Sequence, residues 1–324
     1  MHYILRRIGF YLIAAWASIT LNFFLPRLMP GDPASVIFAR FQGRMRPEEI
    51  DAMKKAYGLS DDPLWRQYFS YLSGLLHFDL GTSIVAFPAP VTEVIGMSLR
   101  WTLLLGLTSL LISFTLGSLI GVYTAWRRGG WLDSIMPPFF TLVGAFPYFF
   151  LATVALYFIA FRWGWLPMNH GYSDDLSPEW SFTFARSVLK HLILPAGTIV
   201  VVSIGTWLLA MRNTMIGTIA EDYITMAEAK GLPERRIMFR YAARNALLPN
   251  ITAFGMALGF IISGALLTET VFSYPGLGNQ LIIAVRQLDY PLMQGIFLMI
   301  TFAVLIVNLL VDILYVRLDP RVRY

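Results

Sequence analysis

Six long apolar segments recur along this 324-residue chain and constrain its fold more than any other feature. A helix that crosses the roughly 30 Å hydrocarbon core of a bilayer needs about 20 predominantly apolar residues. Each segment is of that length or longer and carries few charges. The sequence therefore predicts an all-α integral membrane protein with six transmembrane helices, at residues 8–29, 101–126, 134–161, 192–211, 251–271 and 292–316. Three prolines are expected to kink the third span, namely Pro137, Pro138 and Pro147.

The composition indicates a bilayer rather than water as the surrounding solvent. Hydrophobic residues make up 56% of the chain and charged residues 14%, against roughly 25% charged in soluble domains. The chain has no cysteine, and its four histidines are not spaced as metal ligands, so we expect no metal site. The net charge of +5 is attributed to basic loops that orient a membrane protein, and we expect no nucleic-acid partner.

Positive charges concentrate in alternate loops between the spans. Residues 1–7, 127–133, 212–250 and the tail from Arg317 are rich in arginine and lysine, whereas 162–191 offsets its cations with acids. The positive-inside rule then places both termini in the cytoplasm. A cleaved signal peptide is the alternative for the first span. The apolar run of the first span is too long for the core of a signal peptide, and it ends without a small-x-small cleavage site. We therefore expect an uncleaved helix.

The chain is expected to have three parts, at residues 1–29, 30–98 and 99–324. The first holds the N-terminal end and first span, and the last holds a five-helix core. Residues 30–98 form an outer insertion in which Pro47 opens one helical run and Gly58 stops it. A second, amphipathic run reaches Leu76, with apolar residues at helical spacing: Leu64, Tyr68, Tyr71, Leu72 and Leu75. This insertion is either a solvated lid on the spans or a docking surface.

The cytoplasmic segment 212–250 predicts a helix, a break and a second helix. The first helix covers about residues 220–230, and Gly231, Leu232 and Pro233 break it. The second helix is expected to end near Pro249. Along the first helix, small or uncharged residues lie beside charged ones, which would let another protein approach closely: Thr225, Ala227 and Ala229 beside Glu221, Asp222, Glu228 and Lys230.

Arg236, Arg240 and Arg244 recur every four residues and are expected to share one face of the second helix. A basic stripe at this place faces either lipid headgroups or a partner protein. We favour the headgroups.

Two acidic residues fall within the predicted spans. Glu269 lies near the outer end of the fifth span, before the loop 273–279, and Asp312 lies near the cytoplasmic end of the sixth. We expect Glu269 to anchor a re-entrant element, with Arg286 or loop amides as partners, rather than to bind substrate or a proton. Asp312 is expected to reach the interface. The loop residues Tyr274, Pro275, Gly276, Leu277 and Gly278 are a candidate outer gate or scoop.

Motifs of enzymes are absent from the sequence. It contains no Walker-type phosphate loop and no hydrolase or zinc-protease motif. We therefore predict no catalytic residues and no enzymatic activity.

Six short phrases together resemble the ABC importer permeases of the dipeptide/oligopeptide family, in their first (B-type) membrane subunit. Each phrase alone is weak, but their order along nearly the whole chain is specific. They are Met29-Pro30-Gly31-Asp32-Pro33, Tyr57-Gly58-Leu59 through Leu64, Asp79-Leu80-Gly81-Thr82-Ser83, the coupling phrase Asp222–Gly231 followed by Arg244–Pro249, Glu269-Thr270-Val271-Phe272 with Tyr274–Gly278, and Asp289-Tyr290-Pro291.

The coupling phrase departs from the general importer motif, which begins Glu-Ala-Ala and carries a glycine four residues after the second alanine. In this chain the positions of Glu-Ala-Ala are occupied by Thr225, Met226 and Ala227. Only the second alanine, as Ala227, and the glycine, as Gly231, therefore match the motif. Glu228 is consequently a poor candidate for the acid of the motif. Where the general motif ends in Leu-Pro, this chain has Ala243-Arg244.

The resemblance implies a permease subunit in the inner or plasma membrane of a prokaryotic cell. Its partners would be a second permease subunit, two ATPase subunits that hold ATP and Mg, and an external solute-binding protein, with no cofactor on this chain. The residues implied to contact an ATPase are Asp222, Tyr223, Thr225, Met226, Ala227, Glu228, Ala229, Lys230 and Gly231.

The substrate implied by the resemblance is a di- or oligopeptide, with an oligosaccharide or nickel as second choice. An ion-coupled secondary transporter is the alternative function. The scarcity of midplane acids and the lack of paired broken helices count against it.

Overall fold

The computed structural model describes residues 2–29, 62–261 and 266–318. The chain divides into two compact units. The first comprises Met1–Thr102, Ile262–Leu266 and Pro275–Tyr324, and the second comprises Leu103–Ile261 and Leu267–Tyr274. The described residues form helices and contain no β-strand beyond the isolated bridge between Thr82 and Pro90. The predicted all-helical fold is confirmed for the described residues.

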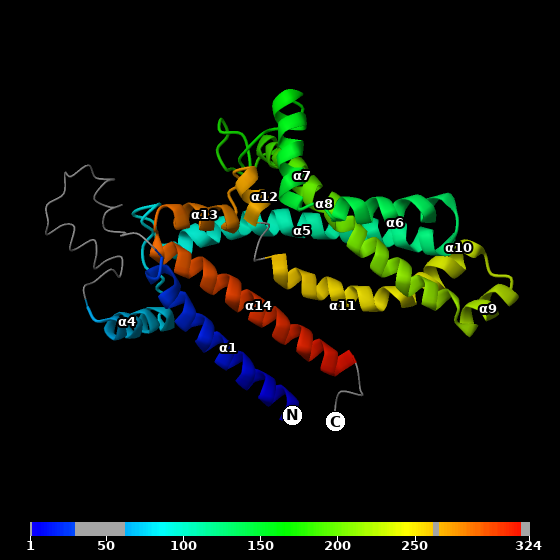
Figure 1. Ribbon diagram of the computed structural model, residues 1–324, viewed down its shortest axis with the longest axis horizontal. Coiled ribbons are helices and arrows are strands. Elements are labelled where there is room, and N and C mark those ends of the chain that lie inside the picture. Colours follow the sequence, from blue (N-terminus) through cyan, green and yellow to red (C-terminus); the bar gives the residue numbers. More distant parts are fainter. Residues whose placement is uncertain (1, 30–61, 262–265, 319–324) are drawn as a thin grey trace. The chain divides into compact units, whose positions relative to one another are not determined.

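Two long apolar helices form the frame of the first unit. Helices α1 (His2–Arg27) and α14 (Tyr290–Leu318) run side by side (Figure 1). Gln294 of α14 donates its side-chain amide to the main-chain carbonyl of Asn22, at 3.3 Å. The core of this unit gathers residues from the start of α5 (Val91–Trp126), from α13 (Leu277–Arg286) and from α14, including Val91, Leu277 and Met293.

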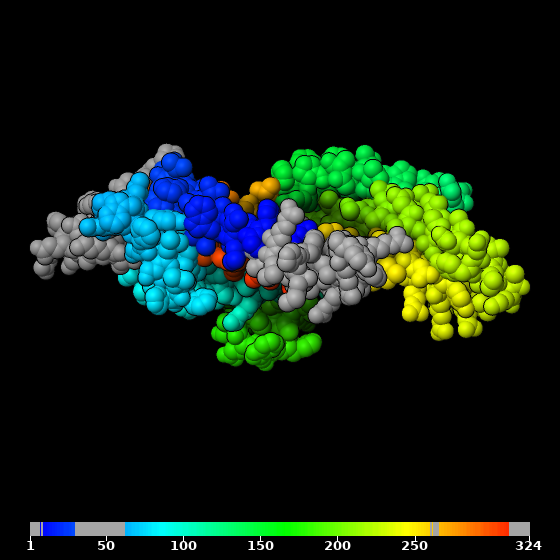
Figure 2. Space-filling model, turned by 90° about the horizontal axis from the view of Figure 1, so that it is seen from below, coloured from blue at the N-terminus to red at the C-terminus, as the bar shows by residue number. Residues whose placement is uncertain are grey.

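The amphipathic run predicted in the outer insertion is a helix, α4 (Leu64–Leu76), which packs on α1. Figure 2 shows the two helices in contact, in cyan and blue. Tyr68 shares a 2.8 Å hydrogen bond with Thr20, and its ring meets that of Phe23 edge-on. Burial on this face raises the pKa of Tyr71 to about 12. The other predicted helix, after Pro47, lies outside the described residues.

Close approach of two helix backbones organises the second unit. Gly117 and Gly121 of α5 face α8 (Phe182–Ile219). A Cβ at Gly117 would lie 2.8 Å from the carbonyl oxygen of Ile204, and one at Gly121 would lie 2.7 Å from that of Leu208. The pair forms a Gly-x-x-x-Gly motif, which lets membrane helices approach without intervening side chains.

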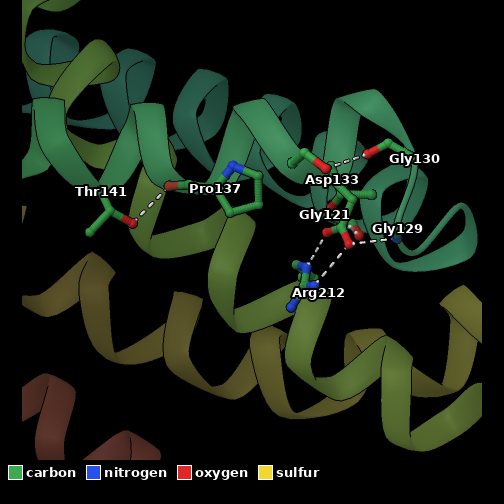
Figure 3. A network of polar contacts seen from close by, with 9 residues as sticks. Gly121, Gly129, Gly130, Asp133, Pro137, Thr141 and Arg212 are labelled. Carbon is green, nitrogen blue, oxygen red and sulfur yellow. Dashed lines mark hydrogen bonds and ion pairs between the residues drawn. The ribbon is translucent and has the colours of Figure 1, made fainter.

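The third predicted span is broken rather than merely kinked. Helices α6 (Trp131–Gly144) and α7 (Tyr148–Ala155), which continues as the π-helix η1 (Leu156–Arg162), meet at 92°. Pro147 lies at this break as the N-cap of α7, whereas Pro137 and Pro138 lie inside α6 without ending it. The hydroxyl of Thr141 donates to the Pro137 carbonyl, one turn earlier in the helix, at 2.7 Å (Figure 3).

Among the described residues, four helices are long and apolar enough to cross a bilayer: Gly9–Arg27, Val91–Trp126, Phe182–Ile219 and Tyr290–Leu310. The bent pair would make a fifth. The remaining expected span, 251–271, includes residues 262–265, which lie outside the described part. On either side of this gap in the sequence are α11 (Arg244–Ile261) and α12 (Leu266–Val271). Six spans therefore stay a prediction.

Helix ends differ from the prediction in two places. Helix α5 begins at Val91, so the expected boundary at residue 98 falls inside a helix. Pro249 was expected to end the second cytoplasmic helix but lies inside α11. Proline is tolerated in membrane helices where neighbouring helices and side chains satisfy backbone groups. Here α11 packs on α8.

Candidate functional site: the helix after α8

The predicted coupling phrase forms a short helix, α9 (Asp222–Ala229), after the end of α8. Asp222 lies in its first turn, where a negative charge complements the helix dipole. Gly231 has a φ of +68°. Its amide donates to the Glu228 carbonyl at 2.8 Å, and the amide of Leu232 donates to the Ala227 carbonyl at 3.3 Å. This pair of bonds is a Schellman cap, and its left-handed position favours glycine.

One face of α9 is packed against its own chain. Ile224 and Ala227, three positions apart, are 1% and 3% exposed and belong to a core cluster with Met211, Met215 and Ile237. The sequence prediction placed Ala227 among the residues that contact a partner. Its methyl group instead lies inside this core, so the close packing that Ala227 permits is with α8 and with the helix that follows α9.

The opposite face of α9 is open. Met226 is 60% exposed, although it is a large apolar side chain, and Tyr223 is 37% exposed. The remaining exposed positions of the coupling phrase are Asp222, Thr225, Glu228, Ala229, Lys230 and Gly231. In Figure 2 this part of the chain, in yellow-green, lies on the surface of the second unit. The structure thus separates an anchoring pair from a surface that a partner could contact.

The residues after Gly231 continue into a long composite helix. Pro233 is the N-cap of α10 (Glu234–Arg236), and the π-helix η2 (Ile237–Ala243) then leads into α11. The indole N–H of Trp126, at the end of α5, donates to Glu234 at 2.6 Å. Because Val122 and Ala125 of α5 share the core cluster of α9, displacement of α9 would be transmitted to α5, α8 and α11.

An ion pair that the sequence reading missed lies close to this region. Arg212 of α8 donates from Nε to one oxygen of Asp133 at 2.6 Å and from Nη2 to the other at 3.1 Å. The amide of Gly129 also donates to Asp133, at 3.0 Å. Figure 3 shows Arg212 reaching from α8 to the first turn of α6. The sequence reading used the charges of this region only to set orientation, and no local pattern joins the two residues.

The candidate outer gate is mostly buried. Tyr274 and Leu277 are 0% exposed, and Gly276 and Gly278 are also buried, whereas Pro275 is partly exposed. The amide of Leu277 donates to the hydroxyl of Thr102 at 2.8 Å. Burial raises the pKa of the Tyr274 hydroxyl, and the charge of Glu269 raises it further.

Glu269 is 1% exposed, and its predicted role as an anchor stays a prediction. Its main-chain carbonyl accepts a 2.7 Å hydrogen bond from the amide of Tyr274, which closes the turn after α12. Glu269 belongs to the second unit and Arg286 to the first. The side chain of Asp312 lies outside the described residues.

Asp289 is a buried carboxylate that the sequence reading quoted only as part of a family phrase. It is 0% exposed, accepts from the Ser83 hydroxyl at 2.6 Å and the Val85 amide at 2.9 Å, and caps α14 through the Leu292 amide at 3.1 Å. Burial raises the pKa of Asp289, and these hydrogen bonds oppose the rise. The contact joins two phrases of the sequence that carry the family resemblance. Across the described residues, no cluster of His, Asp or Glu could hold a metal ion.

Comparison with known proteins gives two family matches and several full-length relatives. The family described as "Binding-protein-dependent transport system inner membrane component" matches residues 117–324, and its N-terminal membrane component region matches residues 1–100. The dipeptide transport system permease protein DppB of Escherichia coli K12 is 33% identical over 100% of this chain and 99% of the relative. The di/tripeptide transport system permease protein DppB of Pseudomonas aeruginosa UCBPP-PA14 is 33% identical with the same coverage. The probable D,D-dipeptide transport system permease protein DdpB of Escherichia coli K12 is 34% identical over 97% of this chain and 95% of the relative.

Proposed function

We propose that this chain, which belongs to the family of binding-protein-dependent transport system inner membrane components, is a permease subunit of an ATP-driven importer of di- or oligopeptides. It would form half of the translocation path and carry out no chemistry itself. A second, related permease subunit would complete the path. The names of the relatives support peptides over oligosaccharides or nickel as substrate.

The observation that carries this proposal is the two-sided character of α9. Ile224 and Ala227 fix the helix to the ends of the long helices, while Met226 is 60% exposed beside a rim of charges. An ATPase subunit would grip this exposed face. Closure of two ATPases on ATP would then favour one conformation of the paired spans over the other, since only a difference in affinity between two states can shift their balance.

The coupling role is tested by reversing the character of the exposed face without touching the core. We expect Met226→Arg to leave the melting temperature of the permease unchanged. The ATPase subunits should no longer be recovered when the permease is purified. Met168→Arg is the matched control, because Met168 is 47% exposed and lies far from α9 in the sequence. Ala227→Asp is unsuitable, since it would bury a charge in the core. Wild-type ATPase recovery in Met226→Arg would contradict the proposal.

Orientation and surroundings follow from the same function. We infer six spans with both termini in the cytoplasm, in the inner or plasma membrane of a prokaryotic cell. An external solute-binding protein would deliver the substrate to the opposite face. ATP and Mg would bind to the partner ATPases and not to this chain. Uptake that persisted in cells lacking those ATPases would favour the ion-coupled alternative.

The outer loop 274–278 is proposed to act as a gate or scoop beside the substrate path. The support is its place between α12 and α13, with the amide of Leu277 held by Thr102 at 2.8 Å. Glu269 would serve as an anchor at the base of this loop.

A further inference from the structure

A cavity of about 540 Å³ lies between α9 and the helix that follows it. Three arginines line it together with polar side chains: Arg236, Arg240 and Arg244 with Tyr223, Tyr241 and Asn245. The amide of Asn245 donates to the Tyr223 hydroxyl at 2.9 Å, which fixes one wall. In the described part of the chain, these arginines form no ion pair, and no acidic residue lines the cavity. The cavity therefore offers donors and positive charge to an anion.

A second cavity, of about 660 Å³, adjoins the first because Arg240 and Arg244 line both. Its other walls are largely apolar and come from α5, α8, η2 and α11, with Phe114, Leu119, Phe239 and Leu247 among them. Leu119 is 43% exposed and lies on a stripe of α5 with Ile112 and Leu116, which are 45% and 43% exposed. The apolar cavity thus opens toward helix surface of the kind that faces hydrocarbon.

The two cavities together form an amphipathic site with cations at the junction. We propose that this site binds an anionic phospholipid, with its phosphate on Arg240 and Arg244 and an acyl chain along Leu119 and Phe239. Basic pockets between membrane helices on the cytoplasmic side are suited to such headgroups. An acidic segment of a protein partner would satisfy the arginines but would leave the apolar cavity unused. The lipid accounts for both parts.

This site has a consequence for coupling. Tyr223 of α9 lines the same cavity as the three arginines. A headgroup bound there would therefore restrain the helix proposed to meet the ATPase, so lipid composition would influence how firmly α9 is held.

The test compares lipids bound to the purified complete transporter in nanodiscs of phosphatidylcholine with and without phosphatidylglycerol of the same acyl chains. Native mass spectrometry measures the lipid retained. We expect retention of phosphatidylglycerol only, and a loss of roughly 30-fold in affinity in Arg240→Gln/Arg244→Gln, as two lipid-facing cations would give. Arg127→Gln/Arg128→Gln removes the same charge from exposed arginines outside the site and should retain the lipid.

A third variant probes the apolar half of the site. Leu119→Trp should weaken phosphatidylglycerol binding several-fold by filling the acyl groove, with the melting temperature confirming a folded chain. Three results would overturn the proposal. The double arginine variant could retain as much phosphatidylglycerol as wild type, or it could lose the ATPase subunits while it still retains the lipid. The third is that Leu119→Trp retains as much phosphatidylglycerol as wild type. A fourth result would overturn it as well. If inorganic phosphate displaced the bound phosphatidylglycerol as readily as added phosphatidylglycerol does, the site would recognise a free anion and not a lipid.

Discussion

Arg212 and Asp133, 79 positions apart in the sequence, form a two-point ion pair that joins α8 to the start of α6. The side chain of Asp133 is 8% exposed and that of Arg212 is 21% exposed. Arg212 lies two turns before the end of the helix that leads into α9. The pair therefore fixes the base from which the proposed coupling helix projects.

Replacing Arg212 by Gln should destabilise the protein by about 3 kcal/mol, because it leaves a largely buried carboxylate without its countercharge. Adding Asp133→Asn should restore part of this loss, since the double variant contains no unpaired charge. Thermal unfolding of the two single variants and the double variant gives the coupling energy. Arg127→Gln, at an exposed position in the α5–α6 turn, is the control. Additive losses in the double variant would mean that the pair contributes no coupling.

Replacing Gly121 by Leu should prevent α5 from packing on α8. A side chain at this position meets the backbone of Leu208, which cannot rotate away, and overpacking of this kind costs about 3 kcal/mol or more. Gly217→Ala is the control, because no atom lies within 4 Å of its added Cβ. That control should stabilise the helix by up to about 1 kcal/mol. Equal melting temperatures for Gly121→Leu and wild type would refute the close approach.

Features that depend on neighbours in sequence were predictable. The apolar face of α4 follows from the helical spacing of its apolar residues, and the rings of Tyr68 and Tyr71 do contact Phe23 of α1. The end of α9 follows from Gly231, whose left-handed φ few other residues adopt readily. The basic stripe at Arg236, Arg240 and Arg244 does share one cavity, even though part of its helix is π-helical.

Features that depend on distant parts of the chain were not predictable in the same way. Ser83 and Asp289 are 206 positions apart, and neither residue type alone indicates a buried contact. Because alanine is small, Ala227 could lie equally well on a surface that a partner contacts or in a core. Its contact with the cluster that contains Met211 and Met215 shows that it lies in the core. The Gly117–Gly121 motif was visible in the sequence and would have indicated the close packing of α5.

Substitutions at Gly231 should rank by their tolerance of a left-handed backbone. No atom lies within 4 Å of a Cβ built there, so the cost comes from the backbone alone. We expect Gly231→Asn to be mild and Gly231→Ala to cost about 1 kcal/mol at the end of α9. Recovery of the ATPase subunits should fall in the order Gly, Asn, Ala, Val. If Val matched Gly in this assay, the cap would not matter for coupling.

Replacing Gly276 by Val should impair uptake while the ATPase subunits still assemble. The φ of Gly276 is −86°, so strain is not the reason. The position is buried next to Leu277, and added volume there costs roughly 1–3 kcal/mol and displaces the loop. Uptake and ATPase recovery are measured on the same membranes, with Gly276→Ala as the graded variant. Normal uptake in the Val variant would exclude a gating role for the loop.

The buried carboxylate of Asp289 should make the first unit less stable as the pH rises. Its folded pKa lies above the unfolded value of about 3.9, because burial disfavours the charged form more than its hydrogen bonds favour it. A raised folded pKa means that the stabilising contribution is complete below the unfolded pKa. It is lost as the pH increases through the folded pKa.

The melting temperatures of wild type and Asp289→Asn, compared across this pH range, isolate that contribution. Asn does not titrate, and every other ionisable group is common to both proteins. Asn replaces one of the two accepting oxygens by an N–H group, which would face either Ser83 and Val85 or the Leu292 amide, so the variant should be the less stable protein at acidic pH. The advantage of wild type should then narrow as the pH rises above about 4. An advantage that widened with pH would show that the hydrogen bonds to the carboxylate outweigh its burial, which would reverse the direction of the pKa shift.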